Sequence, residues 1–358
     1  MTGVQIFWIV VTIEVVMAVW LRIAPAITTS KQDAWLSMLV GGFMGIGVTF
    51  LAVRVSMLHP GQSLAIFSQK LLGKWLGRLI VLPYVAAWYL LAANVLRTFG
   101  DFVHLILLDK TPVWMIMLLM TILMTYITYY CGIQGIARFC EIVGPIIILT
   151  LVISFILNVR NVEWKQIFPI YFDSGWSQIL QGSYAPASFF AESFMLLVIV
   201  SYMQNPKHAL SRSMYSMGAV IFMVIAATFM VLLVFGPNVA AKLRFPFFML
   251  VRSIDILNFI QNLDIFVIFI WVFGVYAKLS FYLCITSSEL ANCIHVKDWR
   301  KVIWVGAPMI FIISCFIPNE STIEFLHELW RILVIPLCGV GIPLLLWIIT
   351  AVQKKTVQ

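Results

Sequence analysis

The chain has 358 residues, of which 62% are hydrophobic and only 11% are charged, and its formal net charge is +8. Soluble domains carry roughly a quarter charged residues, so this composition excludes an ordinary soluble globular protein. Repeated apolar runs of about 20 residues predict an integral membrane protein with many helical spans. In that setting the positive charge is expected to flank the spans and to set their orientation, not to bind nucleic acid.

About ten candidate spans follow one another along the chain, each long and apolar enough to cross a bilayer. The gaps between them leave no room for a soluble domain, so we expect a single all-α membrane domain over residues 1–358. The expected spans are 4–27, 35–57, 79–108, 113–131, 141–158, 183–203, 214–235, 264–290, 302–318 and 332–351.

Positive charges are distributed unequally between the two sides of these spans. An even number of spans puts both chain ends on one side, and 12 of the 23 Lys and Arg residues fall in the loops and span ends of that side. The opposite side holds eight, and the remaining three lie within spans. Because cytoplasmic loops carry an excess of Lys and Arg, this bias predicts that both termini are cytoplasmic.

Two amphipathic connectors occupy equivalent places in the order of spans. Residues 59–78 follow the second span and residues 236–263 follow the seventh, and each precedes an unusually long span. Residues 4–158 and 183–351 are therefore expected to form two five-span units with the same layout. Because five is odd, the two units cross the membrane in opposite directions, which is the inverted-repeat plan of secondary transporters.

The sixth span contains residues that a lipid-facing helix does not need. Its segment SYAPASFFAESF contains Pro186, which lacks a backbone N–H. The segment also contains the small residue Ser188, and it carries the carboxylate of Glu192 near the middle of the membrane. We expect a helix break at Pro186 that lines a cavity, with Glu192 receiving a ligand amine or a proton. The alternative is a first-turn proline and a glutamate that is paired with Lys or Arg.

Two further ionisable residues are expected near the membrane midplane. Glu14 in the first span either lines the cavity, together with Val16 and Met17, or pairs with another helix. The first span has no glycine in this region, which argues against a break there. Lys278 in the eighth span is the best candidate counter-charge for Glu192, for Glu14 or for a ligand carboxylate, and the alternative is a lysine that snorkels along a packed face.

The third span carries Arg97 and Asp101 four residues apart, which predicts an ion pair within one helix. Asn94, one turn earlier, is a candidate cavity residue, and Phe189 and Tyr276 are the aromatic candidates. The sequence contains no H-E-x-x-H, P-loop or G-x-S-x-G motif, and its five histidines are too dispersed for a metal cluster. We therefore expect neither an enzyme nor a bound metal or cofactor.

Several segments, taken in order, resemble the B subunits of the nutrient (germinant) receptors of Bacillus-type endospores, the spore germination permease-like family. That family belongs to the amino acid–polyamine–organocation transporter superfamily, so the resemblance implies a LeuT-like fold. The segments are APAITTSKQDAWLSMLVGG (24–42), FSQKLLGKWLGRLI (67–80), LLDKTPVWMI (107–116), SFFAESFMLL (188–197) and FPFFMLVRSIDILNFIQNLDIFVIFIWVF (245–273).

The resemblance implies a sensor in the inner membrane of the dormant spore that binds an amino acid, sugar or nucleoside. It also implies A and C subunits as partners, and it places Glu192 at the family's glutamate in the sixth span. The first span departs from the family pattern, because EVVMAVW stands where relatives often have a small, Gly-rich stretch.

Three functions follow from these observations. The first is a germinant-sensing subunit that binds its ligand between spans 1, 3, 6 and 8. The alternative is a proton-coupled amino-acid permease. The third is a structural subunit whose pocket no longer binds a ligand.

Overall fold

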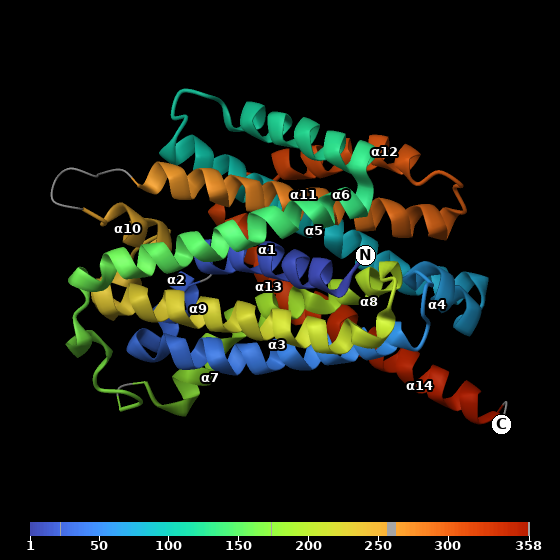
Figure 1. Ribbon diagram of the computed structural model, residues 1–358, viewed down its shortest axis with the longest axis horizontal. Helices are drawn as coiled ribbons and strands as arrows, with labels where there is room; N and C mark the ends of the chain where they lie inside the picture. Colours follow the sequence, from blue (N-terminus) through green and yellow to red (C-terminus); the bar gives the residue numbers. More distant parts are fainter. Residues whose placement is uncertain (22, 173, 256–262, 357–358) are drawn as a thin grey trace.

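The computed structural model describes residues 1–21, 23–172, 174–255 and 263–356, and every regular element in these ranges is a helix (Figure 1). Short 3₁₀ turns join several of them. The α-helices are α1 (Gly3–Leu21), α2 (Ile23–Ser30), α3 (Ala34–Met57), α4 (Leu64–Leu72), α5 (Lys74–Ile106), α6 (Val113–Asn158), α7 (Gly175–Phe190), α8 (Leu196–Ile199), α9 (Ala209–Ala240), α10 (Pro246–Arg252), α11 (Asp264–Ile294), α12 (Arg300–Cys315), α13 (Glu320–Leu329) and α14 (Ile342–Thr356). The 3₁₀ segments are η1 (Lys31–Asp33), η2 (Val159–Asn161), η3 (Trp164–Ile167), η4 (Ala191–Met195), η5 (Val200–Tyr202) and η6 (Pro206–His208), and a π-helix, η7 (Trp330–Gly341), joins α13 to α14.

All ten spans expected from the sequence coincide with helices. Eight helical segments of the described chain are long and apolar enough to cross a membrane. One of them, α6, contains two expected spans, because at Gly132 the backbone adopts φ 56° and the chain reverses direction (Figure 1). Glycine tolerates this conformation because it has no Cβ. The remaining expected span is α12, which has only 16 residues.

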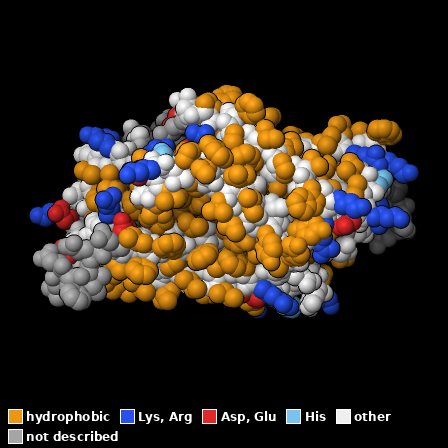
Figure 2. Space-filling view, turned by 90° about the horizontal axis from the view of Figure 1, so that it is seen from above, with side chains coloured by type: hydrophobic (Ala, Val, Ile, Leu, Met, Phe, Trp, Pro, Cys, Tyr) orange, Lys and Arg blue, Asp and Glu red, His pale blue; other side chains and the backbone are white. Residues whose placement is uncertain are grey.

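The outer surface of the protein is apolar around its middle. Large hydrophobic side chains such as Phe43, Leu119 and Phe222 are more than half exposed. Figure 2 shows hydrophobic side chains in a broad band across one face, with Lys and Arg gathered toward both ends. A soluble monomer rarely exposes so much contiguous apolar surface, so the band is the lipid-facing belt of a multi-pass membrane protein.

Each of the two connectors that define the layout contains a short helix among its described residues. Residues 59–78 contain α4 after the second span, and residues 236–263 contain α10 after the seventh. The second connector also includes residues 256–262, which lie outside the described residues. The division into units 4–158 and 183–351 stays a prediction.

The core is built around α1 and the helices that enclose it. From Ile6 to Trp20 most α1 side chains are buried, and α1 packs against α6, α9 and α11. On the other side of the bundle, α3 packs closely along α7 and η4. At Gly45 of α3 a Cβ would clash with Phe190, so the absence of a side chain is what lets the two backbones approach.

Candidate functional site

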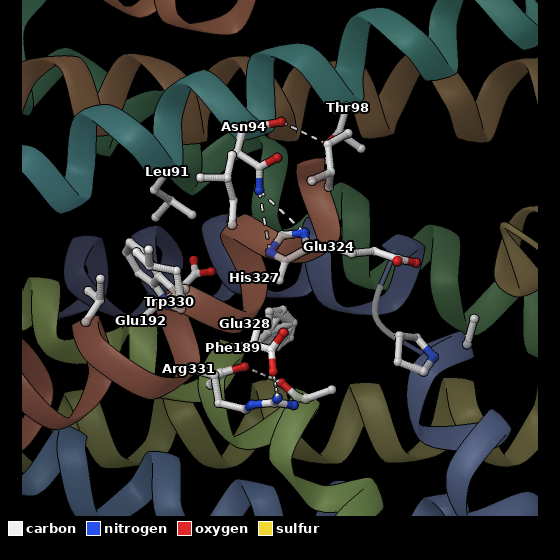
Figure 3. A pocket seen from close by; sticks show the side chains of 18 of the residues that line it. Leu91, Asn94, Thr98, Phe189, Glu192, Glu324, His327, Glu328, Trp330 and Arg331 are labelled. Atoms are coloured by element: carbon white, nitrogen blue, oxygen red, sulfur yellow. Dashed lines mark hydrogen bonds and ion pairs between the residues drawn. The ribbon is translucent and has the colours of Figure 1, made fainter. Parts of the chain in front are cut away.

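A cavity of about 630 Å³ lies between α2, α5, the α7–η4 segment and the α13–η7 segment. This volume is in the range of sites that enclose small molecules. Its lining combines apolar side chains with about as many charged and hydrogen-bonding residues (Figure 3). The polar lining residues are Thr28, Thr29, Asn94, Thr98, Asp101, Ser188, Glu192, Arg244, Glu324, His327, Glu328 and Arg331.

Glu192 is the buried acid of this cavity. Its Oε2 lies 2.7 Å from Nζ of Lys278 on α11, and the two side chains are only 5% and 1% exposed. The lysine ammonium also lies 5.8 Å from the ring centroid of Tyr282, one turn further along α11. Of the partners considered for Lys278, the structure shows Glu192, so the alternative in which Glu192 pairs with a lysine is found together with the cavity. The ion pair is almost completely buried, and its separation would leave a costly buried charge.

Glu14 of α1 lies behind this pair and is completely buried. It is close enough to interact electrostatically with both Lys278 and Glu192. Neither of its carboxylate oxygens has a hydrogen-bond partner among the described residues. Among the described residues, the cluster thus contains two carboxyl groups for one ammonium, so one carboxyl group has no ion-pair partner of its own.

The helix that carries Glu192 changes its winding at that residue. The α-helix α7 ends at Phe190, and residues Ala191–Met195 form the 3₁₀ segment η4 before α8 begins. The break expected at Pro186 is therefore found five residues later. Pro186 lies inside α7, where it packs against Gly41 of α3, and the helix continues past it to Phe190.

The rim of the cavity is polar and contains several side-chain interactions. Nδ2 of Asn94 lies 3.4 Å from Nε2 of His327 on α13 (Figure 3). Nε of Arg97 donates to Asp101 at 3.0 Å, which confirms the predicted ion pair within α5. Among the described residues, no group of three or more His, Cys, Asp and Glu side chains is placed to hold a metal ion.

A sequence profile described as "Spore germination protein" matches residues 1–323, which is most of the chain. The chain belongs to this family of spore germination proteins. It is similar to spore germination protein YndE of Bacillus subtilis (strain 168), with 26% identity over 91% of this chain and 89% of the relative. It is also similar to spore germination protein GerQB of Bacillus cereus, with 25% identity over 90% of this chain and 88% of the relative.

Solved transporter structures share the fold of this spore germination protein. MhsT in complex with L-phenylalanine matches with a TM-score of 0.67 and 14% identity, covering 95% of this chain and 87% of MhsT. A Na⁺-coupled sialic acid symporter matches with a TM-score of 0.68 and 13% identity, covering 95% of this chain and 78% of the symporter. At such low identity the likeness establishes a LeuT-like transporter fold and nothing further.

Four of the candidate residues line the cavity of this spore germination protein: Asn94, Ser188, Phe189 and Glu192. Their role as ligand contacts stays a prediction. Glu14 and Lys278 belong to the same charged cluster but are not lining residues.

The other three candidates lie away from the cavity. The backbone carbonyl of Val16 accepts a hydrogen bond from the indole of Trp271 at 3.2 Å, and Met17 is a core residue of the uninterrupted helix α1. The hydroxyl of Tyr276 donates to the carbonyl of Leu123 on α6. A direct ligand contact at these positions would therefore require a conformation different from this one.

The sequence analysis missed the contribution of α13 and η7 to the cavity wall. Glu320, Glu324 and Glu328 of the segment ESTIEFLHELW lie between two expected spans, on the side opposite the termini, and are not among the candidate residues named above. In the structure Glu324, His327 and Glu328 all line the cavity. The signal available in the sequence was the four-residue spacing of these glutamates, which is typical of one face of a helix.

Proposed function

We propose that this protein is a germinant-sensing subunit that binds a small polar nutrient, such as an amino acid, in the cavity beside Glu192. The observation that carries this proposal is a 630 Å³ cavity that reaches a buried Glu192–Lys278 ion pair in a protein of the spore germination family. An ammonium group would bind Glu192, and the apolar part of the ligand would pack against Phe189 and Leu91. No step requires bond making or breaking, so we expect no catalysis.

The same cluster supplies a way to report that binding. A ligand ammonium would compete with Lys278 for the carboxylate of Glu192. Lys278 would then be attracted to Glu14, the carboxyl group that has no hydrogen-bond partner among the described residues. Because Glu14 lies on α1, occupation of the cavity would shift the balance of forces between α11 and α1, two helices in direct contact.

The family and the charge distribution support a proposal for the cellular setting. We place the chain in the spore inner membrane with both termini in the cytoplasm, in agreement with the larger number of Lys and Arg residues on the terminal side. A subunit that senses without transporting needs partners to carry the signal. The A and C subunits of a germinant receptor are the partners that the family resemblance implies.

Germination of spores that carry Glu192→Gln tests the proposal across a panel of amino acids, sugars and nucleosides. Loss of a charge-assisted hydrogen bond costs about 1.5–3 kcal/mol, so the dose response should shift by about tenfold or more. Phe189→Trp reduces the cavity without touching the ion pair and should also weaken the response. Glu141→Gln, which lies on α6 beside Gln5, is the matched control.

Receptor abundance must be measured by immunoblot in every strain, because Glu192→Gln leaves Lys278 without its partner. A normal dose response from both cavity variants, with the protein present at the normal level, would contradict ligand binding in this cavity.

A proton-coupled amino-acid permease is the second candidate. The specific observation in its favour is Glu14, a buried carboxyl group that has no hydrogen-bond partner in the part of the chain that the structure describes. A carboxyl group of this kind can carry a proton in transporters. Uptake by the purified chain in proteoliposomes decides between the two. Saturable amino-acid accumulation that collapses when the proton gradient is removed would favour the permease, and its absence favours the sensor.

A further inference from the structure

A second hollow, of about 530 Å³, lies at the end of the molecule that carries both termini. It is formed by α4, the first residue of α5 and the C-terminal end of α11 with the turn that follows. None of its described lining residues is acidic. They are Ile66, Gln69, Lys70, Lys74, Ala291, Asn292, His295, Val296 and Lys297.

Two tight turns hold the basic side chains around this hollow. Gly73 has φ 83° and separates α4 from α5, so Lys70 and Lys74 lie on either side of the reversal. His295 has φ 59° and ends α11, and the N–H of Val296 then donates back to the carbonyl of Ala291 at 2.9 Å. The four cationic or titratable groups therefore come from three separate segments and face one space.

The walls of the hollow are fixed to each other by buried contacts. Glu289 of α11 is completely buried and accepts a hydrogen bond from the backbone N–H of Ala65 at 2.7 Å, at the start of α4. One turn later, Nδ2 of Asn292 donates to Oγ of Ser63 at 3.0 Å. Glu289 is thus directed to the N-terminus of α4, and it is not among the residues that line the hollow.

The surroundings place this hollow at the level of lipid headgroups. Trp75, Leu76 and Leu79 follow Lys74 on α5 and are 83%, 58% and 62% exposed. An exposed tryptophan beside lysines and exposed leucines is typical of the interface between water and the hydrocarbon core. Arg78, one turn after Lys74, adds a further cation, and its buried Nε has no hydrogen-bond partner among the described residues.

We propose that this hollow binds the phosphate of an anionic phospholipid, with the acyl chains lying along Leu76 and Leu79. Three lysines and a histidine donate hydrogen bonds to phosphate oxygens, and the amides of Gln69 and Asn292 can bind the polar headgroup. A zwitterionic lipid presents a cationic amine that the same lysines repel. The site therefore selects lipids with a net negative charge, of which phosphatidylglycerol is the test case.

The experiment uses the purified full-length chain in detergent micelles with added lipid. Retained lipid is counted by native mass spectrometry, and the midpoint of thermal unfolding is measured with phosphatidylglycerol, with phosphatidylcholine and with inorganic phosphate. The test variant is Lys70→Gln/Lys74→Gln/Lys297→Gln. The matched control, Lys110→Gln/Lys165→Gln/Lys242→Gln, removes three exposed lysines from the opposite side.

We expect phosphatidylglycerol to be retained at least about tenfold better by the control than by the test variant, because each lysine near an anionic headgroup contributes to binding. The lysine-to-arginine version of the test variant should keep the lipid. Equal retention by test and control variants would overturn the proposal, as would equal stabilisation by phosphatidylcholine. Equal stabilisation by inorganic phosphate would show that the ligand is a soluble anion, and the lipid assignment would be wrong.

Discussion

The two buried carboxyl groups at the centre of this protein lie in segments with different helical winding. Glu14 lies in α1, which continues as a regular α-helix from Gly3 to Leu21. Glu192 lies in η4, where the winding tightens to 3₁₀. Only Glu192 lines the cavity and has an ion-pair partner. The difference indicates that the irregular helix presents its carboxyl group to the cavity, whereas the regular helix keeps its carboxyl group in the core.

The largest loss of stability is expected from removing the ammonium group of Lys278, which interacts with both Glu192 and Glu14. Lys278→Met leaves Glu192 and Glu14 buried without a counter-charge, which should destabilise the fold by about 3–5 kcal/mol. Thermal unfolding of the purified chain measures this loss. The double variant Lys278→Met/Glu192→Gln should recover most of the stability, and failure of that rescue would mean that the ion pair is not what makes Lys278 necessary.

A smaller loss of stability is expected where α3 packs against the irregular helix. Gly45→Ala places a methyl group against Phe190, just before η4, and overpacking of this kind costs about 1–3 kcal/mol. Gly47→Ala is the matched control in the same helix, because nothing lies within 4 Å of its added Cβ. If both variants unfolded at the same temperature, the close approach of α3 to η4 would not be needed to hold Glu192 in place.

The smallest effect is expected at Glu14. Glu14→Gln keeps the shape of a side chain that makes no hydrogen bond to the described residues, so unfolding should change by less than about 1 kcal/mol. Under the sensing mechanism the nutrient dose response should nevertheless shift, since Lys278 loses the group to which it would move. A loss of stability as large as that of Lys278→Met would instead show that Glu14 already holds the lysine.

Much of this architecture could be predicted from the sequence because the bilayer imposes it. Apolar runs of about 20 residues located the ten spans. The cost of a lone charge at midplane depth indicated that Lys278 needs a counter-charge, with Glu192 as one of the candidates. The spacing of Arg97 and Asp101 sufficed for their ion pair, because helix geometry alone brings them together.

Other features depend on contacts that no local pattern encodes. The change of winding at Ala191, and not at Pro186, results from packing against Gly41 and Gly45 of α3. The cavity wall made by α13 depends on the way that this short amphipathic helix folds back over α5, where His327 meets Asn94. Local sequence suggested a break and a loop, and tertiary packing decided where each is found.

The reversal at Gly132 has a mechanical consequence. Neighbouring helices in compact proteins are usually joined by loops of two to eight residues, which allow each helix to move without the other. Here the fourth and fifth spans meet at one glycine whose backbone is the only non-helical point in the 46 residues of α6. No loop residues are present to absorb a displacement, so a movement of one span also moves the end of the other span at Gly132.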